Sequence, residues 1–207
     1  MKKATFIVTL FTLLAFSGLK AQKSIGIMKA QGAPLYGFSQ KTADSLFRAA
    51  EKAFFAYQSA CSLRDSKTGN VTSASIEKFL NLFEFNANIV EDFLFVEPQP
   101  EIKSPDYATY VYKYLPQGLD VRFVSAEFTN INYDSLGFYR VFARMVKVVK
   151  NGLTKDLKPV VKSDSCVVTQ FFTFYVEKKE MDKAKIFRIY PQQGLKMVCY
   201  QIGRAHV

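Results

Sequence analysis

The sequence predicts an α+β fold in which N-terminal helices pack on one face of a curved antiparallel sheet of about four to five strands. Before residue 119 the apolar residues recur at steps of three and four, as on one side of a helix. After it they recur at steps of two, as on one face of a strand. The 20 Phe and 11 Tyr residues supply bulk for the layer between helices and sheet.

Residues 39–61 show the clearest helical pattern. Ser39 or Thr42 can cap the first backbone amides, and Asp44 suits the positive end of the helix dipole. The apolar stripe consists of Ala43, Leu46, Phe47, Ala50, Phe54, Tyr57 and Cys61. A one-sided stripe of this width requires a partner surface.

Two further helices and a short strand are predicted before residue 119. The second helix begins at Ser73 and ends at the break of residues 86–88, and the strand covers residues 89–96 and contains Asp92. A third helix starts at Ser104-Pro105-Asp106, where a cap, a proline and an acid follow one another. The expected helix faces are Ile76, Phe79, Leu80 and Phe83, and Tyr107, Tyr110, Val111 and Tyr114.

Four longer strands are predicted in the second half, over residues 119–128, 138–150, 166–177 and 184–190. Within the first of these strands the apolar residues change from odd-numbered to even-numbered positions. A β-bulge is therefore expected near Val124 and Ser125, since it would return them to one face. The third carries apolar residues on both faces, which is typical of a central strand. Asn151-Gly152 is a hairpin signal between the second and third.

The N-terminus has the layout of a signal peptide. Basic residues Lys2 and Lys3 precede an apolar run over residues 4–16, and small residues lead to Ala21. That run is shorter than the roughly 20 apolar residues that span a membrane. We therefore expect residues 1–21 to be removed on export to the periplasm or the cell exterior, and residues 22–38 to form a linker.

The C-terminus resembles a translated sequencing adapter. Residues 202–207, Ile-Gly-Arg-Ala-His-Val, match the adapter up to its stop codon. We expect residues 201–207 to be foreign, the domain to cover residues 39–200, and the natural chain to continue beyond about Tyr200. His206, the only histidine, then lies in the foreign tail.

Charge does not indicate a nucleic-acid surface. With Lys2, Lys3, Lys20 and Arg204 set aside, 24 of the 28 basic residues and all 18 acidic residues remain, a net charge of +6. The basic residues gather around two predicted turns, and Lys147 is counted with the first of them. Solvated turns explain this distribution better than a binding stripe, and we expect no nucleic-acid partner.

Three cysteines, Cys61, Cys166 and Cys199, leave one unpaired if a single disulfide forms. Export permits disulfides. Cys61 with Cys166 is the favoured bridge, but both lie on apolar faces, so two buried thiols are the alternative.

The predicted order of elements resembles a known cone-shaped fold. The resemblance rests on the helix ending at Cys61, on Phe79-Leu80-Asn81-Leu82-Phe83 leading to Asn88-Ile89-Val90-Glu91-Asp92, on Tyr139-Arg140-Val141, on the strand to Val176, and on Lys185-Ile186-Phe187-Arg188-Ile189. Over residues 39–190 it is similar to the NTF2-like (cystatin-like) cone of ketosteroid isomerases and polyketide cyclases, here in an exported bacterial protein. The loop of residues 65–72 and the connection of residues 152–165 are long for a compact member.

Few chemistries fit the remaining residues. Without a native histidine, nucleophile–histidine systems are excluded, and the scattered cysteines lack zinc-ligand spacing. No phosphate loop or calcium loop occurs, so we expect no cofactor and no metal. The resemblance implies an Asp base and a Tyr donor, for which Asp92 with Tyr57, Tyr110 or Tyr114 are the candidates. Ordinary core tyrosines and a surface aspartate are the simpler interpretation.

Arg140 and Arg144 share the strand face opposite Val141. They are candidates for binding an anionic ligand, with plain solvent exposure as the alternative.

The leading functional hypothesis is an exported, non-catalytic module that binds a small ligand or a cell-envelope protein. One alternative is a small isomerase or cyclase with an Asp/Tyr pocket. Another is a structural envelope protein that assembles through an exposed sheet face.

Overall fold

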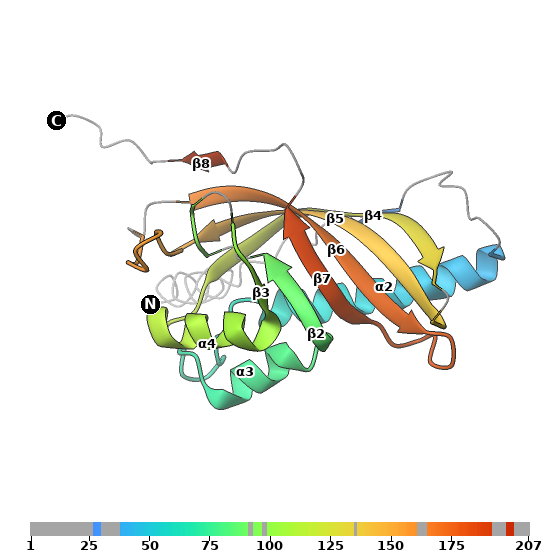
Figure 1. Cartoon of the computed structure of the whole chain (residues 1–207), viewed down its shortest axis with the longest axis horizontal. Coiled ribbons are helices and arrows are strands. Elements are labelled where there is room, and N and C mark those ends of the chain that lie inside the picture. The colour runs from blue at the N-terminus through green and yellow to red at the C-terminus, as the bar shows by residue number, and fades with distance from the viewer. Residues whose placement is uncertain are drawn as a thin grey trace, which may run out of the picture.

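The computed structural model describes residues 38–90, 93–96, 99–134, 136–160 and 165–191, together with the backbone of residues 27–29 and 198–200. The predicted signal peptide, most of the predicted linker, Asp92 and the predicted foreign tail lie outside the described residues. Figure 1 shows a curved, open sheet with a long helix, α2, across one face and two shorter helices beside one end.

The strands form one mixed sheet in the order β1-β4-β5-β6-β7-β2-β3, and β8 pairs with the start of β6. Their bounds are β1 Ile27–Lys29, β2 Phe83–Val90, β3 Glu101–Lys103, β4 Asp120–Tyr133, β5 Phe138–Lys150, β6 Ser165–Glu177, β7 Lys185–Pro191 and β8 Val198–Tyr200. Six strands remain when β1 and β8, described by backbone alone, are set aside. Both counts exceed the four to five strands predicted. The sheet is also not purely antiparallel, because β1 pairs parallel with β4, and β2 parallel with β7.

Helix α2 (Gln40–Ala60) forms as the sequence predicts. The Ser39 side chain accepts a hydrogen bond from the Thr42 backbone amide, which caps the first turn. The apolar stripe lies against the inner face of the sheet, where Phe47 contacts Phe128 of β4 and Tyr57 contacts Phe172 of β6. A single helix thus covers strands that are far apart in the sequence.

Helices α3 (Ser73–Leu80) and α4 (Ser104–Tyr114) complete the helical layer, and β2 and β3 lie between them along the chain. The prediction that helices come first and strands follow is therefore only partly right. Phe83 is not on α3 as predicted but begins β2. The predicted break at residues 86–88 lies inside β2 as a bulge, with Asn86 at a φ of 63°.

Strands β4 to β7 pair antiparallel in sequence order. The bulge predicted near Ser125 is confirmed by a register shift between Phe123 and Ser125, and a second shift follows between Phe128 and Asn130. β6 is a central strand, as predicted, between β5 and β7. On β5 each second residue is buried against the helices, which defines an inner face and an outer face of the sheet.

The predicted bridge between Cys61 and Cys166 is wrong. Cys61 is a buried thiol whose Sγ donates to the Gln58 carbonyl oxygen at 3.5 Å, whereas Cys166 is disulfide-bonded. The residue directly opposite Cys166 in the β6–β8 pair is Cys199. The sequence could not show that Cys199 lies opposite Cys166, because β8 pairs with β6 through long-range contacts.

None of the helices in the described part of the chain combines the length and apolarity that a membrane crossing requires.

Candidate functional site

The inner side of the sheet, where the family resemblance implies an isomerase-type pocket, is filled by aromatic rings in the described structure. Tyr57 is 2% exposed and lies at the centre. Its ring centroid is 5.2 Å from that of Phe172 and 6.0 Å from that of Phe123, both on the sheet. Phe79 and Phe83 enclose it from the side of α3, each at 6.1 Å. The Tyr57 ring is therefore a core element held by four neighbours.

Beside Tyr57 lies a buried lysine that the sequence analysis assigned to a solvated turn. Lys147 is 0% exposed, and its Nζ is 5.9 Å from the Tyr57 ring centroid, within range of a cation–π interaction. The assignment to the turn is wrong because Lys147 lies on the buried, inner face of β5. Strand alternation gave the correct signal, since Lys147 has the parity of the buried Val141, Ala143 and Met145. A lysine this deeply buried is rare and is a mark of functional or tightly paired sites.

Gln170 adds a second polar group to the same interior. Its side chain is 0% exposed, and its Nε2 donates to the Val90 carbonyl oxygen at 3.4 Å, while its Oε1 accepts no hydrogen bond. In the β5–β6 register Gln170 faces Met145, and Lys147 faces Val168, so Lys147 and Gln170 are diagonal neighbours on the inner face. A donor and an acceptor thus lie near one another among aromatic rings.

The other tyrosines predicted for a pocket lie elsewhere. Tyr110 is 38% exposed on α4 and stacks against Tyr114 at 6.1 Å. The tyrosine of α4 that is buried is Tyr107, stacked on Phe79 at 5.7 Å. Of the predicted pocket residues in the described structure, only Tyr57 is within the interior.

Arg140 and Arg144 lie on the outer face of β5, as predicted, but each is matched with a carboxylate. Arg140 donates Nε and Nη2 to Asp134 Oδ2 at 3.2 and 3.1 Å, and its guanidinium lies 5.3 Å from the Tyr175 ring centroid. Arg144 is directly opposite Glu127 in the β4–β5 register. Since Arg140 already has a carboxylate partner, the structure gives little support to a role in binding an anionic ligand.

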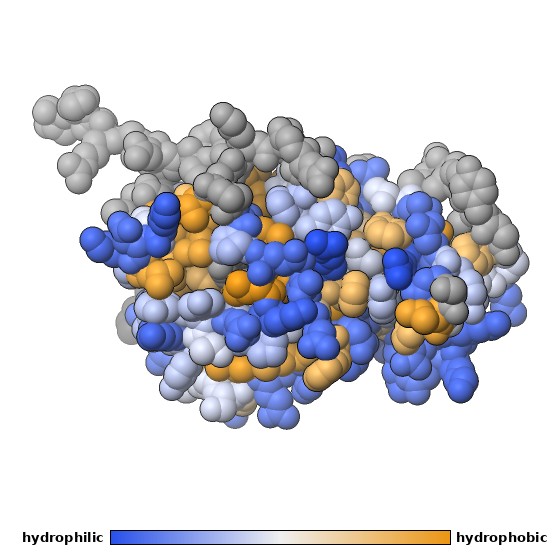
Figure 2. Space-filling view, viewed as in Figure 1, coloured by the Kyte–Doolittle hydropathy of each residue, from blue (hydrophilic) through white to orange (hydrophobic). Residues whose placement is uncertain are grey.

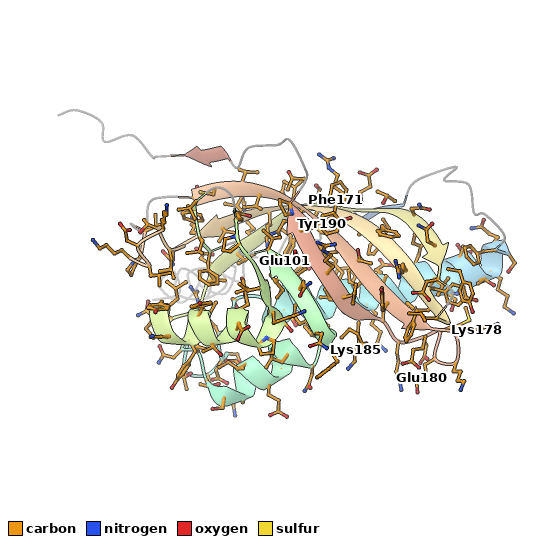
Figure 3. All side chains as sticks on the ribbon, in the orientation of Figure 1. Glu101, Phe171, Lys178, Glu180, Lys185 and Tyr190 are labelled. Carbon is orange, nitrogen blue, oxygen red and sulfur yellow. The ribbon has the colours of Figure 1, made fainter. Side chains whose placement is uncertain are left out.

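The same outer face carries aromatic residues in contact with one another. Tyr175 stacks on Phe187 at 4.1 Å and on Phe138 at 5.5 Å. Phe171 stacks on Tyr190 at 5.6 Å, near the end of β7 (Figure 3). We call these five half-buried residues the outer aromatic row. Because their ring faces are turned to one another, they present ring edges to solvent, and Figure 2 shows hydrophobic and hydrophilic residues intermixed on the visible side of the molecule.

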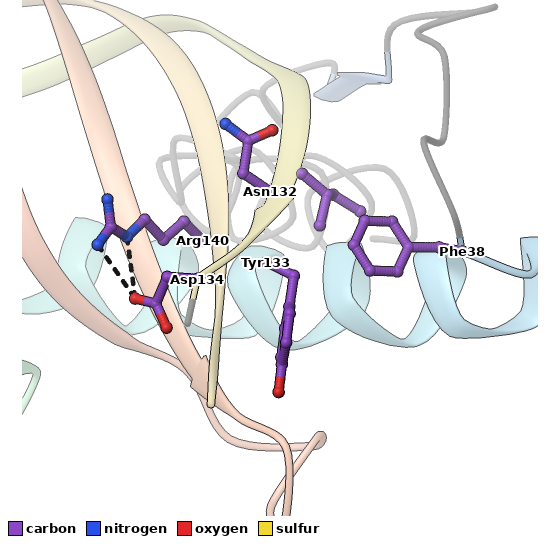
Figure 4. A pocket seen from close by; sticks show the side chains of 6 residues that line it. Phe38, Asn132, Tyr133, Asp134 and Arg140 are labelled. Atoms are coloured by element: carbon purple, nitrogen blue, oxygen red, sulfur yellow. Dashed lines mark hydrogen bonds and ion pairs between the residues drawn. The ribbon is translucent and has the colours of Figure 1, made fainter. Parts of the chain in front are cut away.

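A cavity of about 450 Å³ lies at the hairpin that joins β4 and β5. Phe38 and Tyr133 line it together with the Asp134–Arg140 ion pair. In Figure 4 the Phe38 ring and the ion pair lie on opposite sides of the hairpin strands, so these groups do not converge on one point. The arrangement explains the stability of the hairpin better than it explains binding.

The pKa of the Asp134 carboxyl is lowered in this hairpin. Burial acts to raise the pKa of its carboxyl, but hydrogen bonds from the Phe138 and Leu136 backbone amides and from Arg140 outweigh burial and lower it from 3.8. The carboxylate therefore stabilises the hairpin at any pH above about 4.

We expect Asp134→Asn to lower the free energy of unfolding by about 1 kcal/mol at neutral pH, because charge-assisted hydrogen bonds are lost. A depressed carboxyl pKa contributes stability that is present above the unfolded-state pKa and is lost as pH falls through the folded-state value. The difference between variant and wild type should therefore shrink below about pH 4. Urea unfolding measured between pH 7 and pH 2.5 checks this, and a difference that grows on acidification would contradict it.

Among the described residues, no group of three His, Cys, Asp or Glu side chains is placed to hold a metal ion.

No protein-family model and no curated protein match the sequence. Several solved structures resemble it in the arrangement of helices and sheet. One is a ketosteroid isomerase-like protein from Erwinia carotovora atroseptica, with 14% identity, a TM-score of 0.41, and coverage of 73% of this chain and 95% of that chain. Another is an uncharacterized protein with a cystatin-like fold from Caulobacter vibrioides, with 11% identity, a TM-score of 0.44, and coverage of 76% and 90%.

The fold resembles the NTF2-like cone. The predicted resemblance is seen in the architecture itself, where α2 lies across the inner face of a curved, open sheet. A hexachlorocyclohexane dehydrochlorinase from Novosphingobium barchaimii is also similar, with 10% identity, a TM-score of 0.42, and coverage of 77% of this chain and 99% of that chain. At such low similarity no activity and no residue role is transferred to this chain.

Proposed function

We propose that this chain is an exported, non-catalytic binding module that recognises a protein partner with the outer face of its NTF2-like sheet. The observation that carries the proposal is the division of aromatic residues between the two faces. The inner rings are packed into the core around Tyr57, whereas the outer aromatic row is partly exposed.

Among the described residues, the rings packed around Tyr57 occupy the space that an isomerase or cyclase pocket would need. An active site of that kind needs an open, largely apolar pocket of about 300 Å³ or more, with convergent polar groups. The described cavities instead lie at the hairpin and at the opposite end of β5, outside the aromatic interior. Lys147 and Gln170 are the interior residues on which a catalytic alternative would depend, and both are fully buried.

Charge on the outer face supports a protein partner over an anionic ligand. Arg140 is paired with Asp134, and Arg188 donates to both carboxylate oxygens of Glu101 at 3.1 and 3.2 Å. With these charges balanced, the outer aromatic row provides the apolar contact area. Aromatic and arginine side chains are enriched in protein interfaces.

Site-specific photo-cross-linking tests the partner surface. A photoreactive phenylalanine analogue is placed at Phe187 or at Phe171 of the full chain, in cells that export it. We expect one discrete protein adduct from both positions, because both side chains reach the outer surface of neighbouring strands.

Export is tested separately, by mass spectrometry of the exported form. We expect its N-terminus to be Gln22.

The matched control is the analogue at Tyr112, which is 57% exposed on α4. It should give no such adduct. The proposal is contradicted if neither outer-face position yields an adduct, or if the Tyr112 position yields the same adduct in equal amount.

A further inference from the structure

A second cavity, of about 500 Å³, lies where three connections meet at the end of the sheet opposite the β4–β5 hairpin. One wall is the α2–α3 loop with Arg64 and Asn70, another is the turn before β4 with Gln117, and the third is the end of β5 with Lys150 and Asn151. We call it the basal cavity. None of its lining residues belongs to the outer aromatic row, so it is independent of the function proposed above.

Backbone contacts between the connections hold the basal cavity in shape. The Val71 amide donates to the Pro116 carbonyl oxygen at 2.7 Å, and the Leu119 amide donates to the Ser62 carbonyl oxygen at 3.0 Å. Arg64 Nε donates to the Gln117 carbonyl oxygen, which joins two of the walls. The walls are therefore fixed relative to one another before any ligand arrives, which reduces the entropy lost on binding.

The α2–α3 loop is also ordered from within. Asp65 Oδ1 accepts hydrogen bonds from the Lys67 and Thr68 backbone amides, each at 2.9 Å, and these bonds lower the pKa of the Asp65 carboxyl. This carboxylate is thus committed to its own loop, and Asp120 is the acidic residue that lines the cavity.

The lining is polar throughout. Arg64 and Lys150 supply two positive charges, Asp120 supplies one negative charge, and Asn70, Gln117 and Asn151 supply carboxamides. Asp120 faces Lys150 directly in the β4–β5 register, yet no ion pair joins them in the described structure. Because no aromatic or purely aliphatic side chain lines the cavity, an apolar ligand has little to pack against.

This donor set indicates a particular ligand chemistry. Guanidinium and ammonium groups bind a carboxylate. A carboxylate side chain accepts hydrogen bonds from hydroxyl groups, and carboxamides both donate to hydroxyl groups and accept from them. We propose that the basal cavity binds a sugar acid, with its carboxylate at Arg64 and Lys150 and its hydroxyls at Asp120 and the carboxamides. Hydroxyl recognition distinguishes this ligand from a simple anion, and the charge distinguishes it from a neutral sugar.

Glucuronate, glucose and acetate are the probes. Each is titrated at low salt into the ¹⁵N-labelled exported chain, and the side-chain amide signals of Asn70, Gln117 and Asn151 are followed. We expect saturable shifts with glucuronate. The affinity should be at least about tenfold lower for glucose, which lacks the carboxylate, and for acetate, which lacks the hydroxyl groups. No saturable binding of glucuronate, or equal binding of either control, would overturn the proposal.

Two substitutions assign the roles. Lys150→Met should weaken glucuronate binding about three- to tenfold, whereas Lys185→Met, the same change on β7, should leave it unchanged. Asp120→Asn removes a negative charge, so acetate should bind more tightly while the glucuronate-to-acetate preference falls. Equal affinity of wild type and Lys150→Met, or an unchanged preference in Asp120→Asn, would refute the assignment. Circular dichroism confirms that each variant is folded.

Discussion

Truncating Tyr57 to alanine is expected to lower the free energy of unfolding by about 3–5 kcal/mol, the cost typical of removing a large buried aromatic side chain. Four rings lie within 6.1 Å of its ring centroid, three of them on the sheet and one on α3. These neighbours belong to four different elements, α3, β2, β4 and β6, so they cannot close the resulting cavity by a local shift.

Chemical denaturation of wild type and Tyr57→Ala measures the loss. Tyr112→Ala is the matched control, because Tyr112 is 57% exposed on α4 and its truncation should change stability by less than about 0.5 kcal/mol. Tyr57→Phe retains the ring and isolates the hydroxyl. If Tyr57→Ala unfolds at the same denaturant concentration as the control, the aromatic interior is not the core described above.

Gly118→Ala is expected to destabilise the protein by about 2–5 kcal/mol, for two reasons that act together. The residue has a φ of 65°, where a side chain is strained. A Cβ at this position would also lie too close to the Ser62 carbonyl oxygen. This oxygen belongs to the backbone and already accepts a hydrogen bond from the Leu119 amide. The turn would have to move away from the end of α2, and the basal cavity would lose one wall.

Gly69→Ala separates these two causes. Gly69 has a similar φ of 71°, but a Cβ there would meet no atom within 4 Å. Only the strain of about 1–2 kcal/mol should remain in that variant. Equal losses of stability in the two variants, measured by thermal and urea unfolding, would show that the close approach to Ser62 is unimportant.

Long local patterns predicted the elements well. The stripe from Ala43 to Tyr57 identified α2, and the parity change around Ser125 identified a bulge, because both signals lie within one continuous segment. Prediction failed at β2, where the bulge around Asn86 imitates a chain break. It failed at Lys147 as well, where charge was given more weight than strand alternation.

The candidate sites were less predictable, since they depend on segments that are distant in the chain. Tyr57 was identified from its helix, but its neighbour Phe172 comes from β6 and could not be linked to it by spacing. The same is true of the basal cavity, where Arg64 and Lys150 lie on different connections. Arg140 was identified as a surface residue, but its partner Asp134 became evident only in the folded hairpin.

Sequence by itself determined the three helices and the four long strands from β4 to β7, because periodicity and capping act over a few neighbouring residues. Tertiary structure alone decided that β2 pairs parallel with β7, that β8 pairs with β6, and that a lysine is enclosed beside Tyr57. These outcomes depend on contacts between residues up to about a hundred positions apart, and such contacts are selected by the packing of the whole molecule rather than by any local preference.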